Sequence, residues 1–133
     1  MSYLFDSNAI FLAFKRGKED ILIDEYTINL AYFELGNVIW KELFIHKSIN
    51  KEEAEELINI LSDILSLMKI IDMSVLDIEV LRFAYESGLT YYDASYAYAA
   101  LSNDLILVTE DKRLRNAIRN KVKVVSIDDV KKT

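Results

Sequence analysis

The sequence predicts an α/β protein, a three-layer α/β/α sandwich around a central, mostly parallel sheet. Short uninterrupted apolar runs suit buried strands, longer stretches with a helical period lie between them, and no proline, repeat or linker interrupts the chain. Strands buried on both faces need helices on both sides, and connecting helices favour parallel pairing. With 133 residues, the chain is expected to form one domain, 1–133.

The first half of the chain alternates in the expected way. Residues 3–5 predict the first strand and residues 7–15 a short helix. A second strand falls either at 21–23 or at 25–28, and a helix is expected over 30–44. Asn50 is the expected N-cap of the next helix, which opens at Lys51 with acids in its first turn. Its apolar stripe, at the 3.6-residue period, is Ala54, Leu57, Ile58, Leu61, Leu65 and Met68.

The second half repeats the alternation with shorter elements. Residues 69–73 predict a buried strand, and 75–86 a helix that ends at Gly88, a residue suited to a C-cap. Residues 93–102, rich in Ala and Tyr, predict another helix. The run LILV at 105–108 predicts a strand, followed by a helix over 111–120 and a last strand over 122–125.

Composition excludes whole classes of chemistry. The chain has no Cys and one His, so it has no disulfide framework, thiol nucleophile, usual Cys/His zinc site or two-histidine nuclease site. His46 stands in the polar stretch FIHKS and is expected to be a solvated surface residue. Catalysis is therefore left to carboxylates. No apolar run suits a membrane span and the start lacks a secretory pattern, so we expect a cytoplasmic protein without membrane association.

The charge of the chain is acidic overall but basic in places. A net charge of −6 argues against a nucleic-acid binder when it is taken as a sum. One basic run nevertheless extends from Lys112 to Lys123 without an acid, and a smaller cluster lies near Lys15 and Arg16. Two interpretations stay open for these residues, a solvated helix face and a contact with phosphates.

Two acidic positions share one place in the predicted sheet. Asp6 ends the first strand, and Thr109-Glu110-Asp111 follows LILV. Ligands of open parallel sheets bind outside the carboxyl ends of the strands, where these acids would meet. Helix N-capping is the alternative for Asp6 and Asp111, and equally for Asp93 at the start of its Ala-rich helix.

Glu34 has no capping role, because it lies inside the helical stretch LAYFELGNVIW. Leu30 and Val38, one turn to either side, make its helical face apolar. Such a Glu either lies at the edge of the stripe or is buried with a partner, and Lys41 is two turns away. Several carboxylates gathered together would repel one another, which a hard cation such as Mg²⁺ or Mn²⁺ relieves. Metal-assisted phosphodiester hydrolysis is the chemistry that such a site suits best.

Four motifs in order, FDSNAI, FELGNV, YYDASYAYAA and LVTEDKRL, resemble those of the PIN domain family. The resemblance covers nearly the whole chain and is strongest to VapC-type ribonuclease toxins of toxin–antitoxin pairs. It implies that Asp6, Glu34, Asp93 and Asp111 are the acidic metal ligands and catalytic residues. It also implies that Asn8 and Thr109 support the acids by hydrogen bonding. The family's usual Thr-x-Asp has Glu110 in the middle here, so either Glu110 or Asp111 would reach the metal, with Asp111 favoured.

The same resemblance implies function and partners. It implies a Mg²⁺- or Mn²⁺-dependent endoribonuclease, a homodimer, and an antitoxin whose C-terminal segment lies in a groove near the active site. The stripe from Leu57 to Met68 would line such a groove, a dimer face or simply the core. A PIN-like module that binds RNA or a partner without cleavage stays open as an alternative. The residues expected to hold RNA phosphates by charge are Lys15, Arg16, Lys112, Arg113, Arg115 and Arg119.

Overall fold

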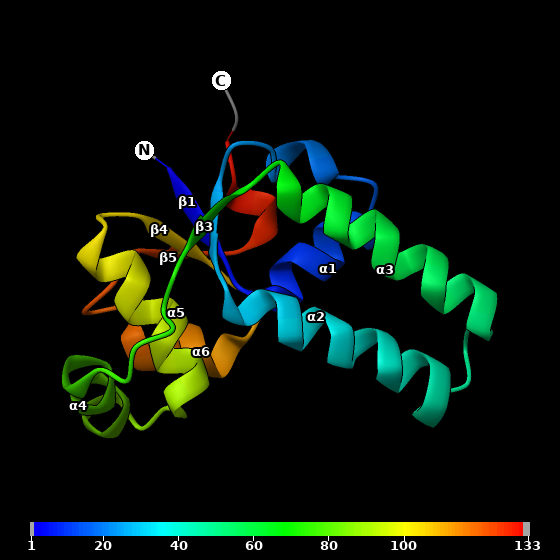
Figure 1. Ribbon diagram of the computed structural model, residues 1–133. Helices are drawn as coiled ribbons and strands as arrows, with labels where there is room; N and C mark the ends of the chain where they lie inside the picture. The colour runs from blue at the N-terminus through cyan, green and yellow to red at the C-terminus, as the bar shows by residue number, and fades with distance from the viewer. Residues whose placement is uncertain (1, 132–133) are drawn as a thin grey trace.

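A computed structural model describes residues 2–131. Its centre is a sheet of five strands in the order β3-β2-β1-β4-β5, and every neighbouring pair is parallel (Figure 1). The sheet is thus wholly parallel, where the sequence predicted a mostly parallel one. The strands are short: β1 Tyr3–Phe5, β2 Tyr26–Ile28, β3 Lys69–Ile71, β4 Ile106–Val108 and β5 Val124–Val125.

Six α-helices connect and cover these strands. They are α1 Ser7–Lys15, α2 Leu30–Trp40, α3 Lys51–Ser66, α4 Ile78–Ser87, α5 Tyr91–Ser102 and α6 Lys112–Ile118. Three shorter helical turns complete the described chain, η1 Glu19–Ile21, the π-helical η2 Lys41–Ile45 and η3 Ile127–Asp129.

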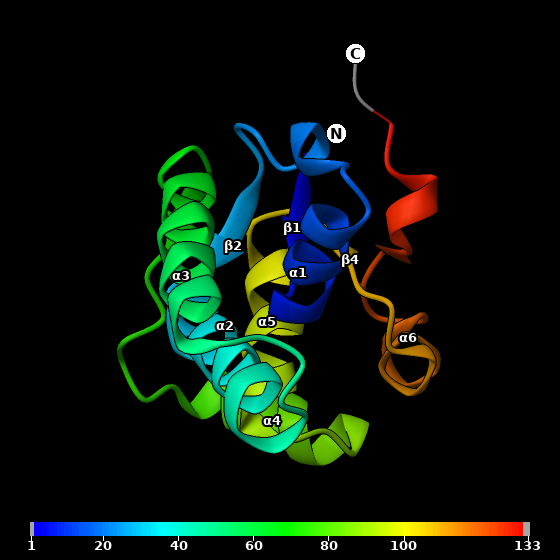
Figure 2. The same cartoon turned by 90° about the vertical axis from the view of Figure 1, so that its right-hand side faces the viewer.

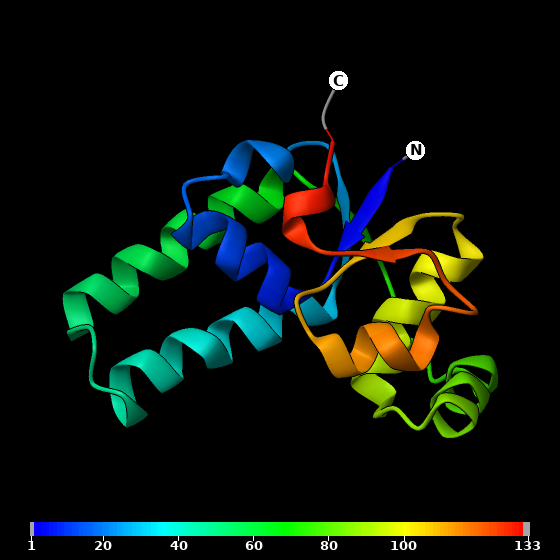
Figure 3. The same cartoon turned by 180° about the vertical axis from the view of Figure 1, so that it is seen from behind.

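The helices form two layers on opposite faces of the sheet, which confirms the predicted sandwich. In Figures 1 and 3, α1, α2 and α3 lie on one side of the strands and α4, α5 and α6 on the other, and Figure 2 faces the layer of α1, α2 and α3. The burial of successive β1 residues follows this division: Phe5 packs in the core under α1, α2 and α3, whereas Leu4 packs in the core under α4, α5 and α6. Alternate residues of a strand point to opposite faces, so both faces of β1 are apolar.

Several predicted boundaries shift, each for a local reason. Of the two candidates for the second strand, 25–28 is confirmed, because β2 pairs with both β1 and β3. The helix expected over 30–44 changes at Lys41 to π-helical hydrogen bonding, with the His46 amide donating to the Lys41 carbonyl at 2.8 Å. Asp77 caps α4, so this helix begins later than expected, and Gly88 ends it in the left-handed conformation with φ of 69°.

The sheet order places a switch point between β1 and β4. From β1 the chain moves to β2 and β3 on one side, and later to β4 and β5 on the other. Phe5 pairs with Val108, so the carboxyl ends of β1 and β4 meet there, in the position where open α/β sheets bind ligands. Within residues 2–131 no helix is both long and apolar enough to cross a bilayer.

Candidate active site

Asp6 stands at the switch point and is almost fully buried, with 7% of the residue exposed. Its backbone amide donates to the Val108 carbonyl at 3.2 Å, which ties the end of β1 to the end of β4. Its side chain accepts a hydrogen bond from the Ala9 amide at 2.8 Å, so Asp6 is also the N-cap of α1. The capping interpretation of Asp6 is therefore correct, and it is compatible with a second role.

The surroundings of Asp6 disfavour its charged form. Desolvation by burial, with smaller contributions from Asp93 and Glu34, raises the pKa of Asp6 from 3.8 to about 7, although hydrogen bonding by Thr109 and Ala9 opposes the rise. A cap alone does not require an Asp with so strongly raised a pKa, because an Asn, which cannot ionise, caps a helix equally well. Groups with strongly perturbed pKa values gather at functional sites.

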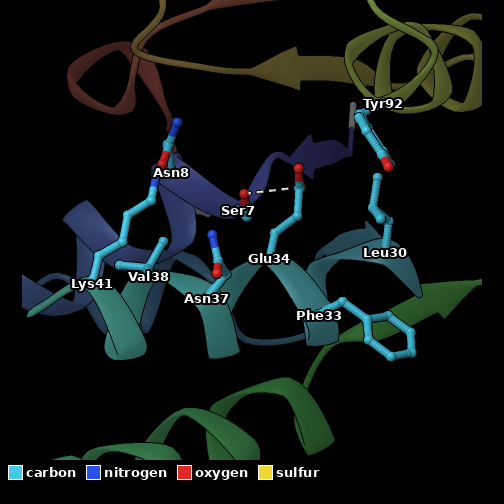
Figure 4. A pocket seen from close by; sticks show the side chains of 9 residues that line it. All are labelled: Ser7, Asn8, Leu30, Phe33, Glu34, Asn37, Val38, Lys41 and Tyr92. Carbon is cyan, nitrogen blue, oxygen red and sulfur yellow. Dashed lines mark hydrogen bonds between the residues drawn. The ribbon is translucent and has the colours of Figure 1, made fainter. Parts of the chain in front are cut away.

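Glu34 is partly buried and is held by two hydroxyl groups. Its Oε1 accepts hydrogen bonds from Ser7 Oγ at 3.1 Å and from Tyr96 Oη at 2.7 Å (Figure 4 shows the first). Burial, reinforced by the Glu34 charge, raises the pKa of Tyr96 above its usual value, so Tyr96 stays a neutral donor. Glu34 is thus neither a free residue at the edge of the stripe nor a partner of Lys41.

Asp93 lies in the first turn of α5 but does not cap it, so the capping interpretation of Asp93 is wrong. Thr90 is the cap, and its hydroxyl accepts a hydrogen bond from the Asp93 amide at 3.1 Å. The Asp93 carboxylate is thereby left for other use. Burial raises its pKa, as do the charges of Asp111 and Glu34, whereas the nearby Arg113 lowers it.

Asp111 and Glu110 have different surroundings. Asp111 is exposed and caps α6, accepting from the amides of Arg113 at 2.9 Å and Leu114 at 3.2 Å. The Glu110 carboxylate accepts instead from the Ile127 amide at 2.8 Å and pairs with Arg115 at 3.9 Å. Glu110 therefore braces η3, and Asp111 is the residue whose charge acts on Asp93.

The two predicted supporting residues also differ. Thr109 is fully buried, its hydroxyl accepts from the Asp111 amide at 3.2 Å, and hydrogen bonding by its side chain lowers the pKa of Asp6. Thr109 thus links two of the predicted acids. The exposed Asn8 side chain makes no hydrogen bond with an acid among residues 2–131, and lines a pocket instead.

The predicted RNA-binding residues divide by their partners. Lys112 and Arg113 are exposed in the first turn of α6, next to Asp111. Arg115 donates to the Thr109 carbonyl at 2.9 Å and supports the loop. Three further residues lie away from Asp6: Arg119 follows the last turn of α6, and Lys15 and Arg16 lie at the far end of α1, where Arg16 is 4.0 Å from Asp128.

The four predicted ligands affect one another electrostatically but do not converge. Asp6 is influenced by Asp93 and Glu34, and Asp93 by Asp111 and Glu34. Among the described residues 2–131, no three Asp, Glu or His side chains lie close enough to hold an ion as they stand. The donor chemistry nevertheless fits a hard divalent cation, because all four are carboxylates and a cation would relieve the penalty on Asp6.

Ser7 and Tyr96 are the supporting residues that sequence reasoning missed. Two signals pointed to them. Ser7 follows Asp6 directly. Tyr96 is three residues after Asp93, so the side chains of Asp93 and Tyr96 lie on one face of α5. Neither signal indicated that the two hydroxyls would meet at Glu34, since this contact joins α1, α2 and α5.

Comparison with known proteins finds relatives in both sequence and structure. The chain is 36% identical over 120 residues to "Exonuclease VapC9" of Pyrobaculum aerophilum, covering 86% of this chain and 84% of that protein. The crystal structure of PAE2754 from the same organism superposes with a TM-score of 0.78 at 32% identity, covering 96% of this chain and 90% of that one.

More distant structures share the fold. A chain of a toxin–antitoxin complex from Klebsiella pneumoniae matches with a TM-score of 0.64 at 21% identity, over 93% of this chain and 96% of that one. A chain of VapBC2 from Rickettsia felis matches with a TM-score of 0.61 at 19% identity, over 95% and 98%. The family model described as "PIN domain" matches residues 3–120, so the chain belongs to the PIN domain family and is of the VapC type.

Proposed function

We propose that this protein is a metal-dependent nuclease that hydrolyses phosphodiester bonds in RNA. The observation that carries the proposal is the buried Asp6, whose pKa is raised to about 7 at the switch point of the sheet, within the influence of Asp93 and Glu34. Burying an acid within the influence of two others costs stability, and a catalytic role explains this cost. The name of the curated relative, an exonuclease, supports a nuclease.

Under this proposal Asp6, Glu34, Asp93 and Asp111 hold Mg²⁺ or Mn²⁺. When bound, such an ion supplies an activated water and stabilises charge on the leaving oxygen. The protein's part is positioning: Ser7 and Tyr96 orient Glu34, and the α1 cap fixes Asp6. The Thr109 side chain links the Asp6 and Asp111 turns by hydrogen bonding to both.

The substrate phosphates would be held by cations beside the acids. Lys112 and Arg113 are best placed, since they follow Asp111 and the Arg113 charge already acts on Asp93. Contacts of this kind weaken as salt rises, because phosphate binding releases counterions. Lys15, Arg16 and Arg119 would contact only a longer RNA that extends beyond the acids.

The test is cleavage of an end-labelled RNA pool with Mn²⁺, with Mg²⁺ and with EDTA. Wild-type protein should cleave with a metal and lose activity with EDTA, and the Asp6→Asn variant should be inactive under all three conditions. The Glu110→Gln variant is the matched control, since its carboxylate contacts the Ile127 amide and should be dispensable for cleavage. Cleavage that survives both EDTA and Asp6→Asn would refute the proposal.

The mode of cleavage needs its own substrate pair. The sequence predicted an endonuclease, whereas the relative from Pyrobaculum aerophilum is named an exonuclease. A linear RNA and a circular RNA of the same sequence separate the two modes, because a circle offers no end. We expect both RNAs to be cut. Cleavage of the linear RNA while the circular RNA stays intact would establish an exonuclease.

Two apolar surfaces support the expected protein partners. Between α2 and α3, pockets of about 300 and 380 Å³ share Gly36, Ile39 and the exposed Ile58, and we assign this groove to an antitoxin segment. The α4 region exposes Leu76, Ile78 and Tyr85, and we assign it to a homodimer. The molar mass in solution of wild-type and Leu76→Glu protein tests the dimer.

A second candidate is a PIN-like module that binds RNA or a partner without cutting. The lack of a converged group of three acids within residues 2–131 is the observation that favours it. A binding module would keep its RNA affinity with EDTA and in the Asp6→Asn variant, and no condition of the cleavage test would yield products. A cytoplasmic location stays a prediction in either case.

A further inference from the structure

One face of α2 points away from the core. The opposite face, with Ala31, Leu35 and Ile39, is buried in the core that α2 shares with α1 and α3, which explains its apolar character. Core packing explains only part of the outward face: Leu30 packs against the core under α4, α5 and α6, but the residues of this face also surround an open pocket. They recur every three or four positions along the helix: Leu30, Phe33, Glu34, Asn37, Val38 and Lys41.

The pocket lies directly beside Glu34 and has a volume of about 410 Å³. Ser7 and Asn8 of α1 and Tyr92 of α5 complete its lining, so three helices meet around it. Pockets for small organic groups begin at about 300 Å³, so a nucleotide-sized group fits by volume. In Figure 4, Asn8 and Lys41 stand at one end of the pocket and Leu30 and Tyr92 at the other, with Glu34 and Asn37 between them.

The polar end of the pocket contains groups that folding does not use. The side chains of Asn8, Asn37 and Lys41 make no hydrogen bond or ion pair with any residue of 2–131. Each carboxamide offers two donors and one acceptor, the combination that matches the edge of a nucleobase. Lys41, the first residue of η2 and two helical turns after Glu34, adds one positive charge to this end of the pocket, where it suits a substrate phosphate.

The other end of the pocket exposes two aromatic rings. Phe33 is 78% exposed and Tyr92 is 61% exposed, although neither ring stacks on another aromatic side chain within the described residues. Solvent-exposed aromatic side chains next to a nuclease site are suited to stacking on unpaired bases. The outward face of α2 thus combines base-edge partners, a phosphate partner and a stacking surface in one row.

We propose that this pocket is a nucleobase subsite, which binds one unpaired base of the RNA next to the scissile phosphate. Asn37 and Asn8 read the edge of the base, Lys41 binds its phosphate, and Phe33 or Tyr92 stacks on the adjoining base. The position next to the scissile bond rests on the nuclease function proposed above; the binding of a base does not. A base must leave its helix to enter the pocket, so the substrate is single-stranded at this point.

The first test measures binding without cleavage. Wild-type protein in EDTA is titrated with each of the four nucleoside 5′-monophosphates while the side-chain amide signals of asparagine are followed by NMR. The signals of Asn8 and Asn37, assigned from their Ala variants, should shift with a preference among the four bases. The Asn37→Ala variant should bind the preferred nucleotide about tenfold more weakly. The Asn120→Ala variant, changed at an exposed residue after α6, should bind like the wild type.

The second test reads base preference during cleavage of a randomised single-stranded RNA pool. Wild-type products should show a preference at one position beside the cut, and Asn37→Ala should lose it while continuing to cleave. Phe33→Ala should lower kcat/KM about tenfold on all sequences alike, because stacking tolerates every base. Phe44→Ala removes a comparably exposed ring outside the pocket and should leave kcat/KM unchanged.

The outcomes separate the subsite from the nuclease. Shifts at Asn8 and Asn37 without cleavage by the wild type would support the subsite and refute the nuclease. Cleavage with an unaltered base preference in Asn37→Ala, or nucleotide shifts that miss both carboxamides, would overturn the subsite and leave the nuclease standing.

Discussion

The β1–α1 turn and the β4–α6 turn have the same local design and different surroundings. Each connects a parallel strand to a helix that an Asp caps, directly after β1 for Asp6 and three residues after the end of β4 for Asp111, and the two strands are neighbours in the sheet. Asp6 is buried and within the influence of acids from α2 and α5, which raise its pKa further. Asp111 is exposed and begins a basic helix.

This difference teaches that a strand-Asp-helix pattern does not by itself define a catalytic acid. The cap stabilises both turns by a similar local hydrogen bond. What distinguishes Asp6 is chiefly its burial, which raises its pKa, and the charges of Asp93 and Glu34, from elements distant in sequence, add to that rise. The β1–α1 turn should therefore limit stability at neutral pH, whereas the β4–α6 turn should not.

The largest effect is expected for Asp6→Asn in metal-free protein. The folded pKa of Asp6, about 7, lies above the ordinary aspartate value of 3.8, so the folded state binds the proton more tightly than the unfolded state. The stability that protonated Asp6 contributes is fully present below about pH 4. It is lost as pH rises through about 7, and the free energy of unfolding falls by about 4 kcal/mol in all. An Asn cannot ionise and still caps α1, so the variant should avoid this loss.

Urea unfolding at pH 5 and pH 8 in EDTA checks this expectation. Asp6→Asn should be more stable than the wild type at pH 8, with a smaller difference at pH 5. Asp111→Asn is the matched control on the second turn, because it removes a charge from an exposed cap. Equal pH dependence in all three proteins would show that the two turns do not differ as described.

A smaller effect is expected for Tyr96→Phe, which removes one of the two hydroxyls that hold Glu34. Hydrogen bonds to charged groups contribute about 1.5–3 kcal/mol, and this one is 2.7 Å long. The free energy of unfolding should fall by about 2 kcal/mol. Tyr98→Phe removes a hydroxyl from the same helix that makes no hydrogen bond within residues 2–131, and it should be nearly neutral. A similar loss in both variants would mean that the Glu34 contact adds nothing specific.

The smallest effect concerns the exposed turn itself. Asp111→Ala removes the acceptor for the Arg113 and Leu114 amides and should cost about 1 kcal/mol, while Asp111→Asn should cost less because Asn also caps helices. Thermal unfolding at pH 5 compares the two variants under conditions that keep the Asp6 contribution small. Equal stability of the Ala and Asn variants would mean that the cap is not what stabilises this turn.

Sequence patterns predicted the strands and helices because these depend on local period and capping. Asn50 and Gly88 behave as expected for this reason. The patterns failed where contacts join distant elements. They also failed at one local position, the α5 cap, because both Thr90 and Asp93 suit a cap and only the backbone geometry decides between them.

The candidate site shows the same division. The order of the motifs indicated which acids belong together, since the carboxyl ends of β1 and β4 meet in the sheet. The hydroxyls of Ser7 and Tyr96 at Glu34, and the outward face of α2, could not be predicted. The sequence predicts an apolar face around Glu34, but that face is only partly core: Leu30 packs against the core under α4, α5 and α6, and both Leu30 and Val38 line an open pocket.

The most direct test of the metal site is calorimetry of Mn²⁺ binding at pH 7 in two buffers with different heats of ionisation. Because burial raises the pKa of Asp6 to about 7, part of its population carries a proton at this pH, and an ion that binds its carboxylate should displace that proton into the buffer. Wild-type protein should bind with a heat that depends on the buffer, Glu110→Gln should behave alike, and Asp6→Asn should lose both affinity and buffer dependence. Equal binding of Mn²⁺ by wild-type and Asp6→Asn protein, or no binding by either, would contradict a metal site built on Asp6.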